Sequence, residues 1–314
     1  SAVHAVQQLD AAARRMQVRD WQFAALRETG RDANQPGSPY AGDFSRGYAA
    51  LAMLFPGIED RNADGSFARY DGDINLFASR VKSENGGSIS FLAPGGDVIV
   101  GLPNTPAALV DVGSDVLGIV AAGAGDVKGA ARGDMRVNQS RILTVGGGDV
   151  LLWSSEGDID AGKGKKTASA VPPPIVRVDA QGNITLEQQG AVTGSGIGAL
   201  FVAGGSAGDV DLVAPKGTVD AGDAGIRAGN LNIAAQVVLG ADNISVSGTS
   251  TGTPVADASA VSAASSGASN AGGEVASATS SLAQNLSEAA RAAEELKKAF
   301  RPTFISAEVI GHGD

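Results

Sequence analysis

The sequence predicts an all-β solenoid, a parallel β-helix with helical segments at both ends. Three observations support this fold class: a fifteen-residue phrase that occurs three times, strand-like alternation inside each copy, and glycine-rich corners. The copies begin at Gly87, Gly148 and Gly208, and each has glycine at its first, tenth and fifteenth positions. Evenly spaced strand–turn–strand units are typical of solenoids. A β-propeller fits less well, because its blades usually need about 40–50 residues.

Each copy has the pattern of a short strand with one apolar face. In the third copy, Val210 and Leu212 are two residues apart and point to one side, whereas Asp209 and Asp211 point to the other. We therefore expect the valine and leucine to lie inside and the two aspartates to form a solvated strand edge. Looser copies of the phrase begin at Gly72, Gly125, Gly133, Gly182, Gly229 and Asp242.

The spacing of the copies predicts how far apart equivalent residues lie. The copies start 61 and 60 residues apart, and a β-helix coil commonly uses about 20 residues, so we expect three coils in each interval. Adjacent coils are about 4.8 Å apart, which would separate equivalents such as Asp149 and Asp209 by about 14 Å. On this count the equivalents cannot pair.

The chain divides into four predicted segments. Residues 1–71 form a helical and irregular cap, with one helix over 1–28 that stops at Gly30 and a shorter one over 44–55 that Pro56 ends. Residues 72–247 form the β-helix, from which the proline-rich stretch 163–174 leaves as a loop. Residues 248–280 are a linker rich in Ser, Ala and Gly, and residues 281–314 carry an amphipathic helix over 281–300 and a terminal strand.

Two roles are open for the helices. The end of a β-helix exposes unpaired backbone N–H and C=O groups, so a helix at each end is expected to act as a cap. Docking to a partner helix is the alternative.

Composition excludes several classes of function. The net charge of −10 argues against binding to nucleic acid or to an anionic membrane surface, and no apolar run reaches the ~18–20 residues of a membrane span. The chain has no cysteine, and its two histidines, His4 and His312, lie near the ends. Zinc binding and Ser/His or Cys/His catalysis are therefore not expected.

Several phrases resemble one known family. They are Gly72-Asp-Ile-Asn-Leu-Phe, the Ala-Pro-Gly-Gly-Asp-Val of residues 93–98, and the ending Phe304-Ile-Ser-Ala-Glu-Val-Ile-Gly-His-Gly313. Together they resemble the C-terminal domain of filamentous-haemagglutinin-type exoproteins, which are two-partner secretion adhesins of Gram-negative bacteria. The resemblance covers about residues 45–314. It implies a right-handed β-helix, an extracellular or cell-surface location, and a role in adhesion, aggregation or biofilm, and it transfers no catalytic residue.

One loop matches a calcium-binding pattern. Asp60, Asn62 and Asp64 alternate before Gly65, Ser66 follows, and Asp71 occupies the twelfth position. Calcium prefers six to eight oxygen ligands, which such a loop can supply. The pattern departs from the usual loop because Asp replaces Glu at position twelve. The alternative is a polar turn that leads into the first coil.

These observations predict a non-enzymatic, adhesive β-helical domain. Its partners would be a surface receptor or polysaccharide of the host or of bacteria, and an outer-membrane transporter during secretion. One alternative is an anchoring or secretion-control module at that transporter. Another is a carbohydrate-active enzyme that uses Asp209 with Asp211. Trp153 faces outward by alternation, and we expect core or loop packing for it rather than stacking on a sugar.

Overall fold

The computed structural model describes residues 11–103, 117–164, 170–171, 175–178, 184–187, 194–202 and 205–253. The chain divides into two compact units, residues 1–254 and 255–314. The predicted helix over 281–300 and the terminal strand lie outside the described residues, as does nearly all of the predicted linker 248–280. The account below concerns the first unit.

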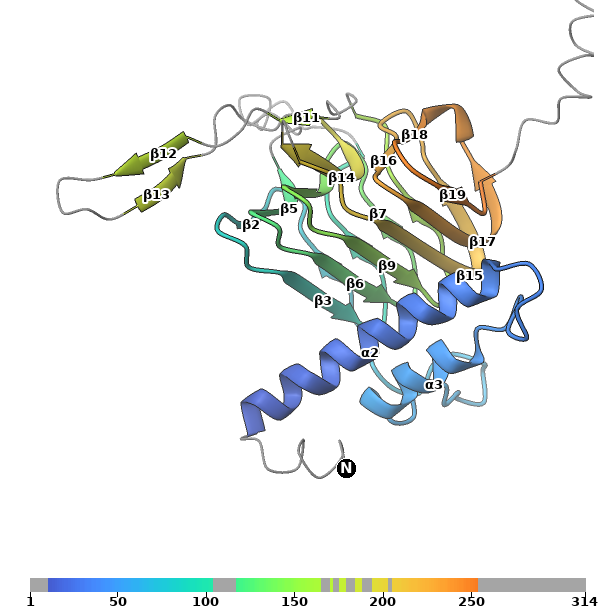
Figure 1. Cartoon of the computed structure of the whole chain (residues 1–314). Helices are drawn as coiled ribbons and strands as arrows, with labels where there is room; N and C mark the ends of the chain where they lie inside the picture. Colours follow the sequence, from blue (N-terminus) through green and yellow to red (C-terminus); the bar gives the residue numbers. More distant parts are fainter. Residues whose placement is uncertain are drawn as a thin grey trace, which may run out of the picture. The chain divides into compact units, whose positions relative to one another are not determined.

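The described strands form parallel coils with three faces (Figure 1). Face A contains β2 (Arg80–Ser83), β5 (Gly118–Ala122), β8 (Arg141–Val145), β14 (Gly196–Val202), β16 (Ile226–Ala228) and β18 (Ile244–Val246). Face B contains β3 (Ile89–Ala93), β6 (Val127–Ala131), β9 (Val150–Ser154), the first halves of β15 (Val210–Asp220) and β17 (Leu231–Leu239), and β19 (Ser250–Thr251). Face C contains β1 (Ile74–Asn75), β4 (Val98–Ile99), β7 (Met135–Arg136), β10 (Ile159–Asp160) and the second halves of β15 and β17. The predicted parallel β-solenoid is confirmed.

The number of coils between the repeated phrases is smaller than predicted. On face B, Val150 is in register with Val127 on one side and with Val210 on the other. The interval from 148 to 208 is therefore a single coil, and that from 87 to 148 is two, because Val127 also pairs with Ile89. The prediction of three coils and 14 Å was wrong; in the second interval the chain inserts further strands between β10 and β14 of adjacent coils, which lengthens the spacing in sequence.

The largest described insertion lies between β10 and β14. It contributes β11 (Ala170–Val171), which pairs with β14, and a separate antiparallel pair, β12 (Ile175–Val178) and β13 (Ile184–Glu187). The phrase at Gly182, expected to be a coil strand, leads into β13 and so belongs to this hairpin. The insertion thus extends beyond the predicted loop 163–174.

The core follows from the alternation in each strand. Val210 and Leu212 are fully buried, as are Val150 and Leu152, and they join a single apolar cluster that runs through the coils. Branched and small residues dominate this cluster, since the interior between three sheet faces is narrow. The predicted inward positions are confirmed.

Helix α2 (Ala11–Asn34) does not cap an end of the coils. It runs across the strands of face B and packs against β9, β15 and β17 (Figure 1). Its Phe23 and Leu26 are buried against outward-facing Leu151 and Val213. The prediction of a terminal cap was wrong for this helix, because the outer side of face B is apolar and needs cover.

Two details of the N-terminal region also depend on packing. The helix continues through Gly30, where the sequence predicts a stop. A Cβ at Gly30 would lie only 2.4 Å from Cγ2 of Val213, so a larger residue would clash with the sheet. The glycine therefore permits close contact between helix and sheet. Helix α3 (Ser45–Leu54) lies inside the range 44–55 and packs against α2.

The glycines that open the second and third copies of the phrase are required by the stacking of coils. A Cβ on Gly208 would lie 2.0 Å from the carbonyl oxygen of Gly148, and a Cβ on Gly148 would lie 2.1 Å from that of Gly125. Backbone atoms of an adjacent coil cannot move aside independently. Only glycine fits at these corners, and the need arises from close approach of the coils.

We expect Gly208→Ala to lower the free energy of unfolding by about 2–3 kcal/mol, because the added methyl group would push two coils apart. Urea denaturation followed by circular dichroism measures this loss. Gly87→Ala is the matched control: Gly87 opens the first copy, and its Cβ would meet only the side chain of Ser83. Equal losses in the two variants would contradict the stacking argument.

Candidate functional site

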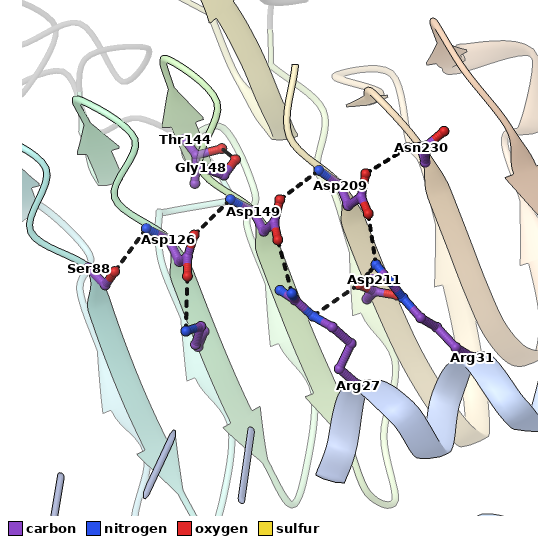
Figure 2. A network of polar contacts seen from close by, with 11 residues as sticks. Arg27, Arg31, Ser88, Asp126, Thr144, Gly148, Asp149, Asp209, Asp211 and Asn230 are labelled. Atoms are coloured by element: carbon purple, nitrogen blue, oxygen red, sulfur yellow. Dashed lines mark hydrogen bonds and ion pairs between the residues drawn. The ribbon is translucent and has the colours of Figure 1, made fainter. Parts of the chain in front are cut away.

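The aspartate that follows the first glycine of the phrase joins neighbouring coils on face B (Figure 2). The backbone N–H of Asp149 donates to Oδ1 of Asp126 at 3.0 Å, and that of Asp209 donates to Oδ1 of Asp149 at 2.9 Å. Ser88 begins this row by accepting from the N–H of Asp126, and Asn230 continues it by donating to Asp209. We call these five residues the face B ladder. Ser88, Asp126, Asp149 and Asn230 each accept from a corner N–H of the next coil, whereas Asp209 accepts from the side chain of Asn230.

A second row of the same kind follows the corner before face C. The N–H groups of Asp97, Asp134 and Asp158 donate to the aspartate of the preceding coil at 2.8–2.9 Å. Asp73 begins this row, and the N–H of Thr218 closes it by donating to Asp158. These five residues form the face C ladder. The repeated aspartate therefore has a structural use in every described coil that carries it.

Cations offset the repulsion between the stacked carboxylates. Lys128 contacts Asp126 at 2.9 Å on face B. On face C, Arg136 reaches both Asp97 and Asp134, at 2.9 and 2.7 Å. These pairs are partly exposed, so each contributes little stability by itself. Their main consequence is that like charges can stand one coil apart.

Helix α2 supplies the cations for the rest of the face B ladder. Arg27 contacts Asp149 at 2.9 Å and Asp211 at 3.3 Å, and Arg31 contacts Asp209 at 3.0 Å (Figure 2). Arg31 also makes two hydrogen bonds of 2.8 Å to the two carboxylate oxygens of Asp211. Residues 27 and 31 are one helical turn apart, so they face the same strands. We call Arg27, Arg31, Asp149, Asp209 and Asp211 the helix–ladder network.

Asp211 is the most buried carboxylate of this network. Its side chain is 0% exposed, which corrects the expectation of a solvated edge at Asp209 and Asp211. Burial raises the pKa of Asp211, and the hydrogen bond and charge of Arg31 oppose that rise. The pKa of Arg31 is raised, chiefly by its hydrogen bond to Asp211. Asp211 is therefore a buried carboxyl that contacts two arginines, Arg27 at 3.3 Å and Arg31 at 2.8 Å.

The network bears on the predicted enzymatic alternative. Asp149 and Asp209, expected to be too far apart to interact, lie on adjacent coils and share a hydrogen bond. Together with Asp211 and the two arginines they form a cluster of acids and bases. The carboxylate of Asp211 is nevertheless covered by α2, and both oxygens of Asp209 accept hydrogen bonds, from Asn230 and Arg31. In this arrangement a polymer cannot touch Asp211.

The ladders predict a loss of stability in acid. Burial raises the pKa of Asp126 and of Asp134, but hydrogen bonds from the next coil and from Lys128 or Arg136 more than reverse this, so both lie below the ordinary value of about 3.9. A carboxyl whose pKa is lowered on folding stabilises the fold above its unfolded pKa. That contribution is lost as the pH falls through the folded pKa. We expect the melting temperature to decrease as the pH falls below about 4.

Asn variants isolate these two groups. Asp126→Asn and Asp134→Asn keep an acceptor oxygen but do not titrate, so each should show a shallower fall in melting temperature between pH 5 and about pH 2.5 than the unsubstituted chain. The comparison also separates them from Asp160 and Asp211, whose pKa burial raises. Parallel curves for variant and unsubstituted chain would contradict the assignment.

Trp153 faces outward from face B but is not available to a ligand. Its side chain is fully buried beneath α3, with ring centroids 5.7 Å from Tyr48 and 6.3 Å from Phe44 in edge-to-face geometry. The indole Nε1 donates to Ser155 Oγ at 3.0 Å. A Cβ on Gly47 would lie 2.4 Å from the ring. The expected packing role of Trp153 is confirmed.

The residues of the proposed calcium loop lie in an exposed turn. Asp64 accepts from the N–H and the hydroxyl of Ser66, Asn62 donates to Ser66, and Asp60 pairs with Arg69 at 3.3 Å. Asp71 lies beyond the bridge between Arg61 and Phe67 that closes the turn. Among the described residues no group of three or more His, Cys, Asp or Glu is placed to hold a metal ion. The turn is thus built by its own hydrogen bonds.

Calcium binding at Asp60, Asn62, Asp64, Ser66 and Asp71 stays a prediction with a direct test. Binding to the folded chain would raise its melting temperature in Ca²⁺ relative to EDTA, because a ligand of the native state stabilises it. Asp64→Ala should abolish that rise. An identical melting temperature in Ca²⁺ and EDTA would leave the turn without a metal.

The sequence did not reveal Arg27 and Arg31 as partners of the ladder. Their spacing of four residues places them on one helical face, but that pattern also fits an exposed polar face. The acidic residues opposite them lie more than 120 residues away in sequence.

Among the described helices, none is both long enough and apolar enough to span a membrane.

Comparison with known proteins gives one match. Residues 147–255 match a family model described as filamentous haemagglutinin family outer membrane protein. The matched segment contains the strands from β9 to β19, with the insertion, and therefore all three aspartates of the helix–ladder network. Neither the curated proteins nor the solved structures gave a match. The resemblance to this family is confirmed over this segment, which lies outside the phrases at residues 72–77, 93–98 and 304–313 that first indicated it.

Proposed function

We propose that this chain is a non-enzymatic, β-helical part of a filamentous-haemagglutinin-type exoprotein that acts in adhesion, aggregation or biofilm outside the bacterial cell. The observation that carries the proposal is the family match over residues 147–255. In this function the coils present an extended surface to a receptor or polysaccharide, and an outer-membrane transporter carries the exoprotein across the membrane.

The use of the acidic residues supports a structural role. Ladder aspartates accept hydrogen bonds from neighbouring coils, and Asp211 is buried beneath two arginines. A glycosidase needs two accessible carboxyl groups about 5–9.5 Å apart on either side of a substrate. Asp209 and Asp211 do not offer that arrangement while α2 covers Asp211.

An adhesion assay tests the function directly. Fluorescent beads coated with the 314-residue chain should remain on host-cell monolayers or on a bacterial biofilm after washing, several-fold more than beads coated with the heat-unfolded chain. Antibodies to the chain should also label intact bacteria that produce the exoprotein. Equal retention of the two kinds of bead, together with labelling only after permeabilisation, would contradict the proposal.

A separate assay addresses the enzymatic alternative. Uronic-acid polymers incubated with the chain should give no new reducing ends and no unsaturated products. Products that disappear on Asp209→Ala or Asp211→Ala would assign an enzyme instead. The folded state of each variant would be verified by circular dichroism.

A further inference from the structure

The polar rows of face B continue beyond the helix that covers them. Asp211 is in register with Asn232, and Asn232 with Thr251, so these three side chains form one outward-facing row. Helix α2 neutralises Asp211 with Arg27 and Arg31 and then ends at Asn34. Asn232 and Thr251 belong to coils at the edge of the helix, where no arginine of α2 contacts them.

A groove of about 500 Å³ lies at this edge. Its polar lining comes from both sides: Arg31 and Gln35 from the end of α2, and Asp209, Asn230, Asn232 and Thr251 from the coils. This volume falls within the range of small-molecule sites in proteins. The groove is therefore large enough for a compact polar group such as one sugar ring.

Asn232 offers an unused donor in this groove. Its side chain is only 8% exposed, and its Oδ1 accepts a hydrogen bond of 2.9 Å from Asn34. Its Nδ2 is buried and has no hydrogen-bond partner among the described residues. A buried donor without an acceptor destabilises the fold, because it has lost its hydrogen bond to water. An oxygen acceptor brought into the groove would remove that cost.

The charges in the groove favour a neutral ligand. Arg31 is the cation of the lining, and its guanidinium already contacts Asp209 and Asp211 at 2.8–3.0 Å. Little positive charge remains for an anion. The apolar lining is limited to Pro36, Leu231 and the stems of polar residues, so a peptide with apolar anchors would find few contacts. Amides and hydroxyls that both donate and accept suit a polyol.

We propose that this groove binds a neutral sugar residue, with Asn232 Nδ2 donating to a sugar oxygen and with Thr251 exchanging hydrogen bonds with its hydroxyls. The proposal rests on the adhesive function above, and it names saccharide as the class of ligand and the edge of α2 as the site. It requires no chemical step, because the sugar is bound and released unchanged.

Saturation-transfer-difference NMR on the full chain tests the site. The probes are the methyl glycosides of glucose, galactose, mannose and N-acetylglucosamine. At least one should receive saturation, and Asn232→Leu and Thr251→Val should each weaken its binding about tenfold, as expected for one lost hydrogen bond in a site that needs it. Thr218→Val is the matched control, since Thr218 lies in the face C ladder outside the groove, and it should bind normally.

Each outcome decides the proposal. If none of the four glycosides binds, or if binding survives both groove substitutions, the sugar site is wrong. Binding of a random-peptide library that Thr251→Val abolishes, with no glycoside bound, would overturn it in favour of a peptide site. Because Thr251 is exposed, its variant keeps the fold even if Asn232→Leu does not. Adhesion of coated beads without glycoside binding would refute this groove and leave the proposed function standing.

Discussion

We expect Trp153→Ala to lower the free energy of unfolding by about 3–5 kcal/mol, the range for removal of a large aromatic side chain from a packed core. Trp153 is the largest of the fully buried side chains and fills the space between face B and α3. Phe44, Tyr48 and Gly47 pack directly on its ring. Their shapes fit the indole, so a small residue would leave a cavity that the rigid sheet cannot close.

Trp21→Ala is the matched control for this substitution. Trp21 is the other tryptophan of the chain, lies on α2 and is 53% exposed. We expect its removal to change stability by less than about 0.5 kcal/mol. Urea denaturation followed by far-ultraviolet circular dichroism compares the two, because it does not depend on tryptophan fluorescence. Similar midpoints for Trp153→Ala and Trp21→Ala would show that α3 and Trp153 do not pack as described.

The second large effect is expected at Asp211. Asp211→Ala should cost about 2–3 kcal/mol, because it removes a buried carboxylate that accepts charged hydrogen bonds, while Arg27 keeps Asp149 and Arg31 keeps Asp209. The exposed pair between Lys216 and Glu156 provides the control, since Glu156→Ala should cost less than about 1 kcal/mol. Thermal and urea denaturation of both variants measure the difference.

A double-mutant cycle separates the buried charge from simple loss of packing. Combining Asp211→Ala with Arg31→Met removes the carboxylate together with its bidentate partner, so the double variant should be more stable than the sum of the two single losses predicts. Strict additivity would show that the pair is not coupled. It would also show that the helix–ladder network adds nothing to the apolar contacts that hold α2 on face B.

Much of the coil could be predicted from the sequence. Alternation of apolar and polar residues in Gly-Asp-Val-Asp-Leu identified Val210 and Leu212 as inward and Asp209 and Asp211 as outward, since side chains of a strand alternate between its two sides. The number of coils could not be predicted. Insertions such as the one that carries β12 and β13 lengthen the chain between two strands without changing their separation of one coil in space.

The candidate site was less predictable than the coil. The acidic residues were visible in each phrase, but their roles depend on which coil lies next to which. Once Val150 and Val210 are known to be in register, Asp149 and Asp209 must be neighbours, and the ladder follows. Arg27 and Arg31 entered only when α2 was placed on face B.

The sequence by itself determined the local pattern: short strands with inward valine and leucine, glycine-rich corners, and an aspartate at most of those corners. Periodicity and side-chain size act over a few residues, so they can be read directly from the chain. Tertiary structure alone decided that the corner aspartates of successive coils hydrogen-bond to one another, that α2 covers the outside of face B, and that Asp211 is buried. These outcomes depend on contacts between residues 23 to 180 positions apart, and sequence spacing does not record the insertions that separate some of them.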